Sequence, residues 1–449
     1  MPKIFSVIEK IKTLIKHQGI KKYSFNAGWL MIDKLLRIFL GLFVGVWVAK
    51  YLGPADFGIL SFALSIVALF GIIGNFGLDQ IVIRNIVNRP EDRDSILGTS
   101  FFLRISGSTF ILLLLFIILQ FTAITAHEKL IIMTVALGQL FLSFNVVDLY
   151  FRSQVKAKFS GLTNSFGAIF SAVLRIAFIL LGFSVLWFAV AVVLEQVVLA
   201  ILFVYFYLRN HLNIFKWRFS FITLKNLMKD GWPLLFSGMA VSIFMNIDQV
   251  MIKEMMNNKA VGEYAVAVKL SQAWYFVPLA ISQSFYPALI KSKKESDSLY
   301  YLRIQNLLNF MAWLSISIGI IMTFASGFII NILYGRAYSE SAMVLSINIW
   351  TGVFISMGTI RGLWINIENL QKYSLYTTLG GVAANVALNL LLIPLYGIMG
   401  AAIASVISYC LTIFSLGFYK RGRELAYRML LPFNPVFIGK TILSFLYKQ

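Results

Sequence analysis

The sequence has a single cysteine, Cys410, and only three histidines among its 449 residues. A disulfide framework needs several cysteines, and a zinc site needs Cys or His ligands that lie close together. His17, His127 and His211 are far apart along the chain. The composition therefore excludes a disulfide-stabilised fold and predicts neither a Cys-based nor a His-based metal site.

Charged residues are also scarce, at 13% of the chain, whereas 59% of the residues are apolar and the mean hydropathy is +0.81. Soluble proteins average about 25% charged and about 45–50% apolar residues. A soluble chain of this length could not bury so much apolar surface. The sequence therefore predicts a polytopic membrane protein and excludes a soluble enzyme.

Long apolar runs predict twelve membrane-spanning helices, because about 20 apolar residues cross a bilayer core about 30 Å thick. Segments rich in Gly and Pro separate the runs, including LGPADFG at 52–58 and DGWP at 230–233. The predicted spans are 24–50, 56–81, 97–121, 130–151, 160–183, 185–208, 231–252, 261–289, 306–334, 341–364, 372–394 and 398–419.

Acidic residues are half as numerous as basic residues, 19 against 39, which gives a formal charge of +20. With a cytoplasmic N-terminus, 28 of the basic residues fall in inner segments, five in outer segments and six within spans. The positive-inside rule then predicts that both termini are cytoplasmic. This topology explains most of the positive charge without a nucleic-acid partner. The predicted outer loops are too short to carry the catalytic groups of a glycosyltransferase or polymerase.

A weak internal repeat divides the predicted spans into two groups of six. KFSGLTNSFGAIFSAVLRIAFILLGFSVLW at 158–187 aligns with KYSLYTTLGGVAANVALNLLLIPLYGIMGA at 372–401. Six spans return the chain to the same side, so the halves are predicted to be parallel repeats, as in transporters that rock two lobes about a cavity. A duplicated channel or scaffold would show the same pattern. The predicted segments are 1–22, 23–208 (N-terminal lobe), 209–230 (linker), 231–419 (C-terminal lobe) and 420–449 (basic cytoplasmic tail).

The first of these segments, 1–22, is basic and amphipathic. It is predicted either to lie as a helix on the inner leaflet or to be a solvated tail.

The first predicted hairpin carries a family resemblance. The turn YLGPADFGILSFA at 51–63 and the following GLDQIVIRNI at 77–86 resemble the polysaccharide transporter family, the O-antigen and exopolysaccharide flippases of the multidrug/oligosaccharidyl-lipid/polysaccharide exporter superfamily. The twelve-span layout and the LYG before the last span agree with it. The resemblance implies two six-helix lobes around a V-shaped central cavity. It also implies transfer of a polyprenyl-diphosphate-linked oligosaccharide from the inner to the outer leaflet.

Ionisable residues deep in the predicted spans are the most informative about function, because they are costly in lipid and usually face a cavity or one another. Six basic residues against three acids make the predicted interior net cationic. A diphosphate suits Arg and Lys, whereas a cation or drug antiporter would favour acids. The residues predicted to bind the diphosphate are Lys34, Arg37, Lys269, Arg104, Arg175 and Arg361, and those predicted to act in ion coupling or structural pairing are Asp33, Glu195 and Asp248.

Most of these residues have a structural alternative. Lys34 and Arg37 share one face of the first span, but Arg37 can also pair with Asp33 four residues away. The resemblance implies that basic residues of the first span face the cavity. Lys269 lies in the counterpart span of the second half, so it is expected to face the cavity opposite them or to extend to the membrane interface.

The other charged positions also allow either a functional or a structural role. Arg175 and Glu195 flank a short predicted turn at similar depth, so they form either a buried pair or a coupling site at which Glu195 takes a proton. Asp248 lies either at a hydrated helix end or at an ion-coupling site. Arg104 and Arg361 lie nearer the cytoplasmic side, where they receive the diphosphate first or extend to the interface.

The sequence thus predicts a flippase in a bacterial cytoplasmic (inner) membrane. It contains no P-loop or dinucleotide-binding motif, so the expected driving force is an ion gradient, of protons or sodium, or consumption of the flipped lipid. The expected partners are the lipid-linked oligosaccharide, membrane lipids, and a polymerase or other assembly proteins. The alternatives are a cation or drug antiporter of the same fold and a non-transporting scaffold.

Overall fold

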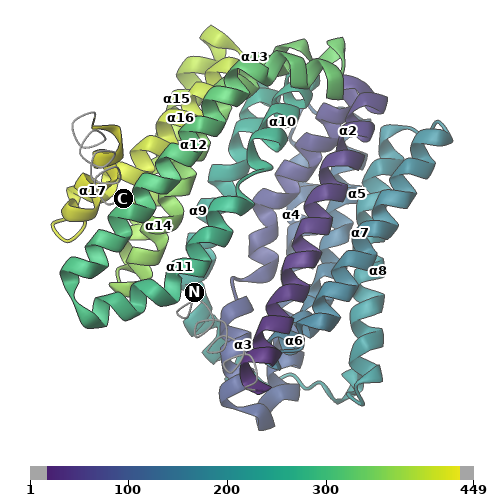
Figure 1. Cartoon of the computed structure of the whole chain (residues 1–449). Coiled ribbons are helices and arrows are strands. Elements are labelled where there is room, and N and C mark those ends of the chain that lie inside the picture. The colour runs from purple at the N-terminus through teal and green to yellow at the C-terminus, as the bar shows by residue number, and fades with distance from the viewer. Residues whose placement is uncertain (1–17, 435–449) are drawn as a thin grey trace, which may run out of the picture. The chain divides into compact units, whose positions relative to one another are not determined.

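The structure, a computed structural model, describes residues 18–434, and this part of the chain is helical without a β-strand (Figure 1). The predicted amphipathic segment 1–22 therefore lies largely outside the described residues, as does the end of the predicted tail 420–449. The described chain forms two compact units. The first comprises residues 18–48 and Ile66–Met239, and the second comprises Ala49–Ser65 and residues 240–434.

Most helices of the first unit are long and apolar enough to cross a membrane. The first and last of them, α2 and α9, each contribute residues to both units. The helices are α2 Gln18–Asn75, α3 Asp79–Asn88, α4 Arg93–Gln120, α5 Ala126–Leu142, α6 Val146–Ser153, α7 Ala157–Leu180, α8 Val185–Arg209 and α9 Phe221–Met255.

The helical stretch α2 includes the first predicted span and most of the second, which was predicted to end at residue 81 but ends at Asn75. Its 58 residues would extend about 87 Å as one helix, far more than a bilayer core needs. Its backbone is non-helical at Gly53, where φ is 71° and ψ is 171°. Glycine suits this position because positive φ strains residues that carry a Cβ. Pro54 follows at the start of the second helix, where its missing N–H costs no helical hydrogen bond.

The second unit continues the helical chain after α9. One predicted span, 341–364, is a pair of helices that are bent by 43° relative to each other. The helices are α10 Asn258–Gln272, α11 Phe276–Glu295, α12 Asp297–Leu333, α13 Ser339–Asn348, α14 Thr351–Ile367, α15 Gln371–Tyr396, α16 Ile398–Phe414 and α17 Arg423–Leu430.

The described residues accommodate the twelve predicted spans. Ten helical stretches pass a test of length and hydropathy, and the bent pair α13–α14 makes an eleventh. Because the first stretch includes both helices that meet at Gly53, it accounts for two spans. The all-helical, polytopic fold class predicted from composition and periodicity is therefore confirmed.

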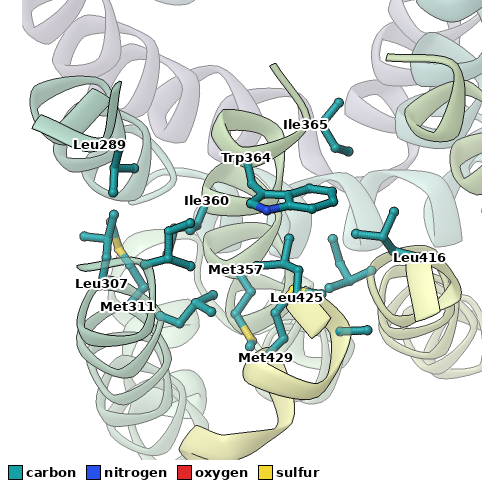
Figure 2. Packing of buried hydrophobic residues seen from close by; sticks show 14 of the residues in the cluster. Leu289, Leu307, Met311, Met357, Ile360, Trp364, Ile365, Leu416, Leu425 and Met429 are labelled. Carbon is teal, nitrogen blue, oxygen red and sulfur yellow. The ribbon is translucent and has the colours of Figure 1, made fainter. Parts of the chain in front are cut away.

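Each unit has its own apolar core. In the first unit, buried side chains of α3, α4, α6 and α8 pack together around Phe151, Phe203 and Tyr207. In the second unit, Trp364 of α14 lies within a cluster from α11, α12 and α16, and its indole is 2% exposed (Figure 2). Leu425 of α17 joins this cluster, so part of the predicted tail is a helix packed on the core of the second unit.

Candidate functional site

The acid of the first span is buried against α7. Asp33 is 2% exposed, and Gly161 of α7 lets the two helices approach closely, because a Cβ there would lie 3.3 Å from the carbonyl oxygen of Trp29. Arg37 Nη2 donates to Asp33 Oδ2 at 2.8 Å, and the Ser165 hydroxyl donates to Asp33 Oδ1 at 3.2 Å. The arginine side chain remains 49% exposed. Arg37 is therefore anchored to Asp33 while much of its side chain stays available to a ligand.

The two intramembrane lysines are both exposed. Lys34 lies beside Asp33 on α2, but on the exposed side of the helix. Lys269 lies on α10, and its ammonium group is 4.6 Å from the centre of the buried Phe57 ring. This distance is suited to a cation–π interaction, which holds the ammonium group without neutralising its charge. Both lysines can offer positive charge to an anionic ligand.

Two of the predicted arginines pair with carboxylates of the first unit. Arg104 of α4 is 3% exposed and donates to Asp79 at the start of α3. Arg175 of α7 donates to Glu195 of α8 at 3.2 Å, and each side chain is about one-quarter exposed. Because an unpaired charge is costly in lipid, each pair stabilises the packing of two helices. A diphosphate would have to compete with these carboxylates.

Arg361 is held by oxygen atoms of two neighbouring helices. It lies on α14, is 5% exposed, and donates to the carbonyl oxygen of Thr412 and to the hydroxyl of Thr377 at 2.8 Å. The planar guanidinium group thus joins α14 to α15 and α16 in the second unit. This arrangement uses the forked donors of arginine, which a lysine could not reproduce.

Asp248 lies at the centre of a buried polar cluster that links four helices of the second unit. Its Oδ2 accepts from the Tyr264 hydroxyl at 2.6 Å and from the Ser405 hydroxyl at 2.5 Å, and its Oδ1 accepts from the amide of Asn389 at 2.7 Å. Asn389 also donates to Asn385 Oδ1 at 3.2 Å. A small cavity of about 20 Å³ lies beside the cluster.

One buried oxygen of this cluster makes no hydrogen bond with the described residues. Asn389 is 0% exposed, and its Oδ1 atom has no hydrogen-bond partner within the part of the chain that the structure describes. Asp248 is 6% exposed. A carboxylate and an amide oxygen are thus buried together in an apolar helical unit, where an unpaired polar atom is costly.

The sequence prediction singled out Asp248 but missed its partners. Asn385 and Asn389 stand four residues apart in an otherwise apolar run, so their amides share one helix face, and this spacing could have identified them. Tyr264 and Ser405 gave no comparable signal. The prediction also missed Glu263 of α10, an acid that is 1% exposed.

Comparison with known proteins places the chain in a family. The family model described as "Polysaccharide biosynthesis protein" matches residues 25–293. The chain belongs to this family. A Haloferax volcanii protein named "Probable flippase AglR" is 25% identical over 392 residues, which cover 84% of this chain and 78% of that protein. A Shigella flexneri protein named "Putative O-antigen transporter" is 24% identical over 401 residues, which cover 84% of this chain and 93% of that protein.

Solved structures support the fold of this family member. The structure of an inward-facing MATE family multidrug resistance transporter of the MOP superfamily superposes with a TM-score of 0.74 at 18% identity, covering 90% of this chain and 98% of that one. The lipid II flippase MurJ in an inward closed conformation gives a TM-score of 0.67 at 15% identity, covering 90% and 91%. These likenesses, together with the family match, confirm the resemblance that the first hairpin carries.

Proposed function

We propose that this protein flips polyprenyl-diphosphate-linked oligosaccharide repeat units across a membrane, from the cytoplasmic to the outer leaflet, by alternating access. Membership of a polysaccharide biosynthesis family and similarity to proteins named as a flippase and an O-antigen transporter support this assignment. The proposed location is a bacterial cytoplasmic membrane with both termini inside, in keeping with the positive-inside bias. A polyprenyl diphosphate, such as undecaprenyl diphosphate, would carry the sugar, and a polymerase or other assembly protein would receive it.

The observation that carries the proposal is the exposure of basic side chains within membrane-spanning helices. Lys34 and Lys269 are exposed, and Arg37 is half exposed although it pairs with Asp33. Exposed intramembrane charges are costly unless a polar ligand or water contacts them. We therefore propose that these three cations each contact the diphosphate during the transport cycle. An antiporter for cationic drugs would be hindered by the same residues.

A second proposal concerns the energy source. We infer that Asp248 binds a proton or a sodium ion and couples its movement to transport, because a buried carboxylate and the unpartnered Oδ1 of Asn389 lie together. Transport in proteoliposomes under a proton gradient and under a sodium gradient would test this inference. Asp248→Asn should remove the response to the coupling gradient, and Asp56→Asn, which neutralises an exposed acid, should not. An unchanged response in Asp248→Asn would refute the coupling role.

Gene deletion in the native host tests the transport function. We expect lipid-linked oligosaccharide to accumulate on the inner leaflet and surface glycan to be lost. Complementation with Lys34→Gln, Arg37→Gln or Lys269→Gln should restore surface glycan poorly at normal protein levels. The matched control Lys158→Gln removes the charge of an exposed lysine at the start of α7 and should restore it fully.

The same experiment separates the alternatives. Intact surface glycan with increased drug sensitivity in the deletion strain would refute the flippase and favour the antiporter. Full complementation by the three neutralised variants would favour a scaffold, because a scaffold does not need to bind the diphosphate.

A further inference from the structure

A polar groove of about 510 Å³ lies between α3, the start of α4 and the first turns of α9, within the first unit. Its volume is within the range of about 300–1,000 Å³ that is typical of small-molecule sites. None of the residues predicted to bind substrate lines it. Its polar lining includes Arg84, Arg89, Asp92, Thr223, Asn226, Lys229 and Asp230.

The groove arises because two amphipathic helices bury their apolar faces in one core. Ile81 and Ile86 of α3 and Leu227 of α9 are buried in the core of the first unit. The opposite faces of both helices carry amides and basic groups, which are consequently left facing the groove. Arg84 pairs with Asp230, so the two helices are joined at the groove.

Hydrogen bonds and a close backbone approach hold this frame in place. The amide N–H of Arg218 donates to the carbonyl oxygen of Asp94 at 3.1 Å, and Ser95 and Thr223 share a hydrogen bond of 3.0 Å. A Cβ on Gly98 would lie 2.7 Å from backbone atoms of Arg218, so only glycine allows this approach. These contacts fix the start of α4 relative to the start of α9, the two elements that line one side of the groove with α3.

The lining favours a ligand that is both anionic and rich in hydroxyl groups. Arg84 and Asp230 form an ion pair and neutralise each other. The other charged lining residues are two cations, Arg89 and Lys229, and one acid, Asp92, so the lining carries one net positive charge. Cationic donors of this kind bind phosphate oxygens. The neighbouring Asn and Thr side chains can both donate and accept hydrogen bonds, as sugar hydroxyls require. A phosphorylated sugar combines these two demands.

Exposed apolar residues next in sequence to the groove lining are consistent with a ligand that is attached to a lipid. Phe221 and Ile222 directly precede Thr223 and are 71% and 75% exposed, and Trp232, two residues after Asp230, is 57% exposed. In a protein with many membrane-spanning helices, such side chains are expected at the lipid interface. The basic residues of the groove belong to segments that the positive-inside bias predicts to be cytoplasmic.

We propose that this groove is a receiving site for the sugar-phosphate head group of the lipid-linked substrate, on the cytoplasmic side of the membrane. The proposal rests on the proposed function and adds a site that precedes the intramembrane cations. Arg89 and Lys229 hold the phosphate, and Asn226 contacts the sugar.

Binding to the full chain in phosphatidylcholine nanodiscs tests this proposal. The probes are radiolabelled glucose 1-phosphate and farnesyl-diphosphate-linked N-acetylglucosamine. Arg89→Gln/Lys229→Gln should weaken binding of both probes at least about ten-fold, the effect of losing one charge-assisted hydrogen bond. The control Lys216→Gln/Lys225→Gln removes the same charge from exposed positions outside the groove and should change affinity less than two-fold.

A further variant separates local contacts from general charge. Asn226→Leu keeps the net charge and places an apolar side chain in the groove, so it should also weaken binding of both probes. Suppose that Arg89→Gln/Lys229→Gln and Lys216→Gln/Lys225→Gln lose equal affinity for the probes and Asn226→Leu loses none. This result would overturn the site, because diffuse electrostatic attraction would then explain binding.

Two outcomes distinguish the source of the ligand. Binding of the farnesyl-linked probe that is no tighter than binding of glucose 1-phosphate would overturn the lipid-linked assignment. Complete competition by phosphatidylglycerol in the nanodisc would also overturn it, because the groove would then be a site for ordinary anionic lipid. Normal surface glycan after gene deletion would refute the proposed function alone, because probe binding to the groove is measured independently of transport.

Discussion

A substitution at Gly58 should force two helices of the second unit apart. Gly58 belongs to the turn that carries the family resemblance, and Gly262 lies opposite it on α10. A Cβ on Gly58 would lie 1.7 Å from the carbonyl oxygen of Asn258 and 3.0 Å from the amide nitrogen of Gly262. A Cβ on Gly262 would lie 1.9 Å from the carbonyl oxygen of Pro54. Both obstructing atoms are backbone atoms, so no side-chain rotation can relieve the overlap.

The size of the effect follows from this geometry. An unstrained contact between nonbonded heavy atoms needs roughly 3.5 Å, so Gly58→Ala must increase the local separation by more than about 1 Å. Overpacking of this kind typically costs about 1–3 kcal/mol, and the backbone overlap places Gly58→Ala at the upper end of this range. The control is Gly45→Ala, because no heavy atom lies within 4 Å of a Cβ at that position in the same helical stretch. Alanine there should be neutral or slightly stabilising.

Thermal unfolding of the purified variants in detergent measures the difference. Gly58→Ala should unfold at a clearly lower temperature than the parent protein, and Gly45→Ala should not. Equal thermal stability of the two variants would refute the close approach of the helices. It would also leave the glycine of the LGPADFG turn without a packing explanation.

Three further predictions concern polar groups that link helices. Arg175→Met should destabilise the protein by up to about 3–5 kcal/mol, because it leaves the Glu195 carboxylate without its partner. The double variant Arg175→Met/Glu195→Leu should have nearly the stability of the parent protein. If a thermal double-mutant cycle instead shows that the losses of the two single variants add, the two side chains do not interact. Arg361→Lys should lose about 1–3 kcal/mol in the same assay, because one ammonium group cannot replace the forked donors, and parent-like stability would argue against this role. Asn389→Leu should destabilise the protein by a similar amount, because Asp248 loses a hydrogen-bond donor. Asp248→Asn should retain most of the protein's stability. A larger loss of stability in Asp248→Asn than in Asn389→Leu would contradict the cluster.

Elements that depend on local sequence could be predicted. Long apolar runs gave the helices, because a bilayer sets their length. The break at Gly53 was predictable, since Gly and Pro together end one helix and begin another. The bend between α13 and α14 was not predicted: no proline marks it, and a single glycine, Gly352, directly after the break is a weak signal in a membrane helix.

The candidate sites were predictable only where the partners are close in sequence. Arg37 and Asp33 are four residues apart on one helix, and their pairing was a stated alternative. Asn389 and Ser405 are 141 and 157 residues from Asp248, so only the fold brings them to the carboxylate. Uncharged polar residues are also common in membrane helices. An ionisable group therefore stands out in a sequence, whereas its amide and hydroxyl partners do not.

The distribution of paired and exposed charges changes how the net positive interior should be interpreted. The sequence prediction treated the six basic residues and three acids as one group, whose net positive charge is available to a diphosphate. In the structure, Arg104 and Arg175 form pairs with carboxylates of their own unit, and Arg361 is held by backbone and hydroxyl oxygens. These arginines connect helices, so their loss should reduce stability first and transport only as a consequence.

Lys34 and Lys269 differ from the arginines in both exposure and chemistry. Both are exposed, and a lysine carries a compact charge on a flexible stem, which can follow a phosphate as it moves. Their replacement by Gln should therefore reduce transport while leaving thermal stability close to that of the parent protein. If the lysine variants instead unfold at lower temperature and the arginine variants lose transport without losing stability, the assignment of the two groups is reversed. The diphosphate would then have to be sought at the arginine pairs, where it would displace the carboxylates that now hold them.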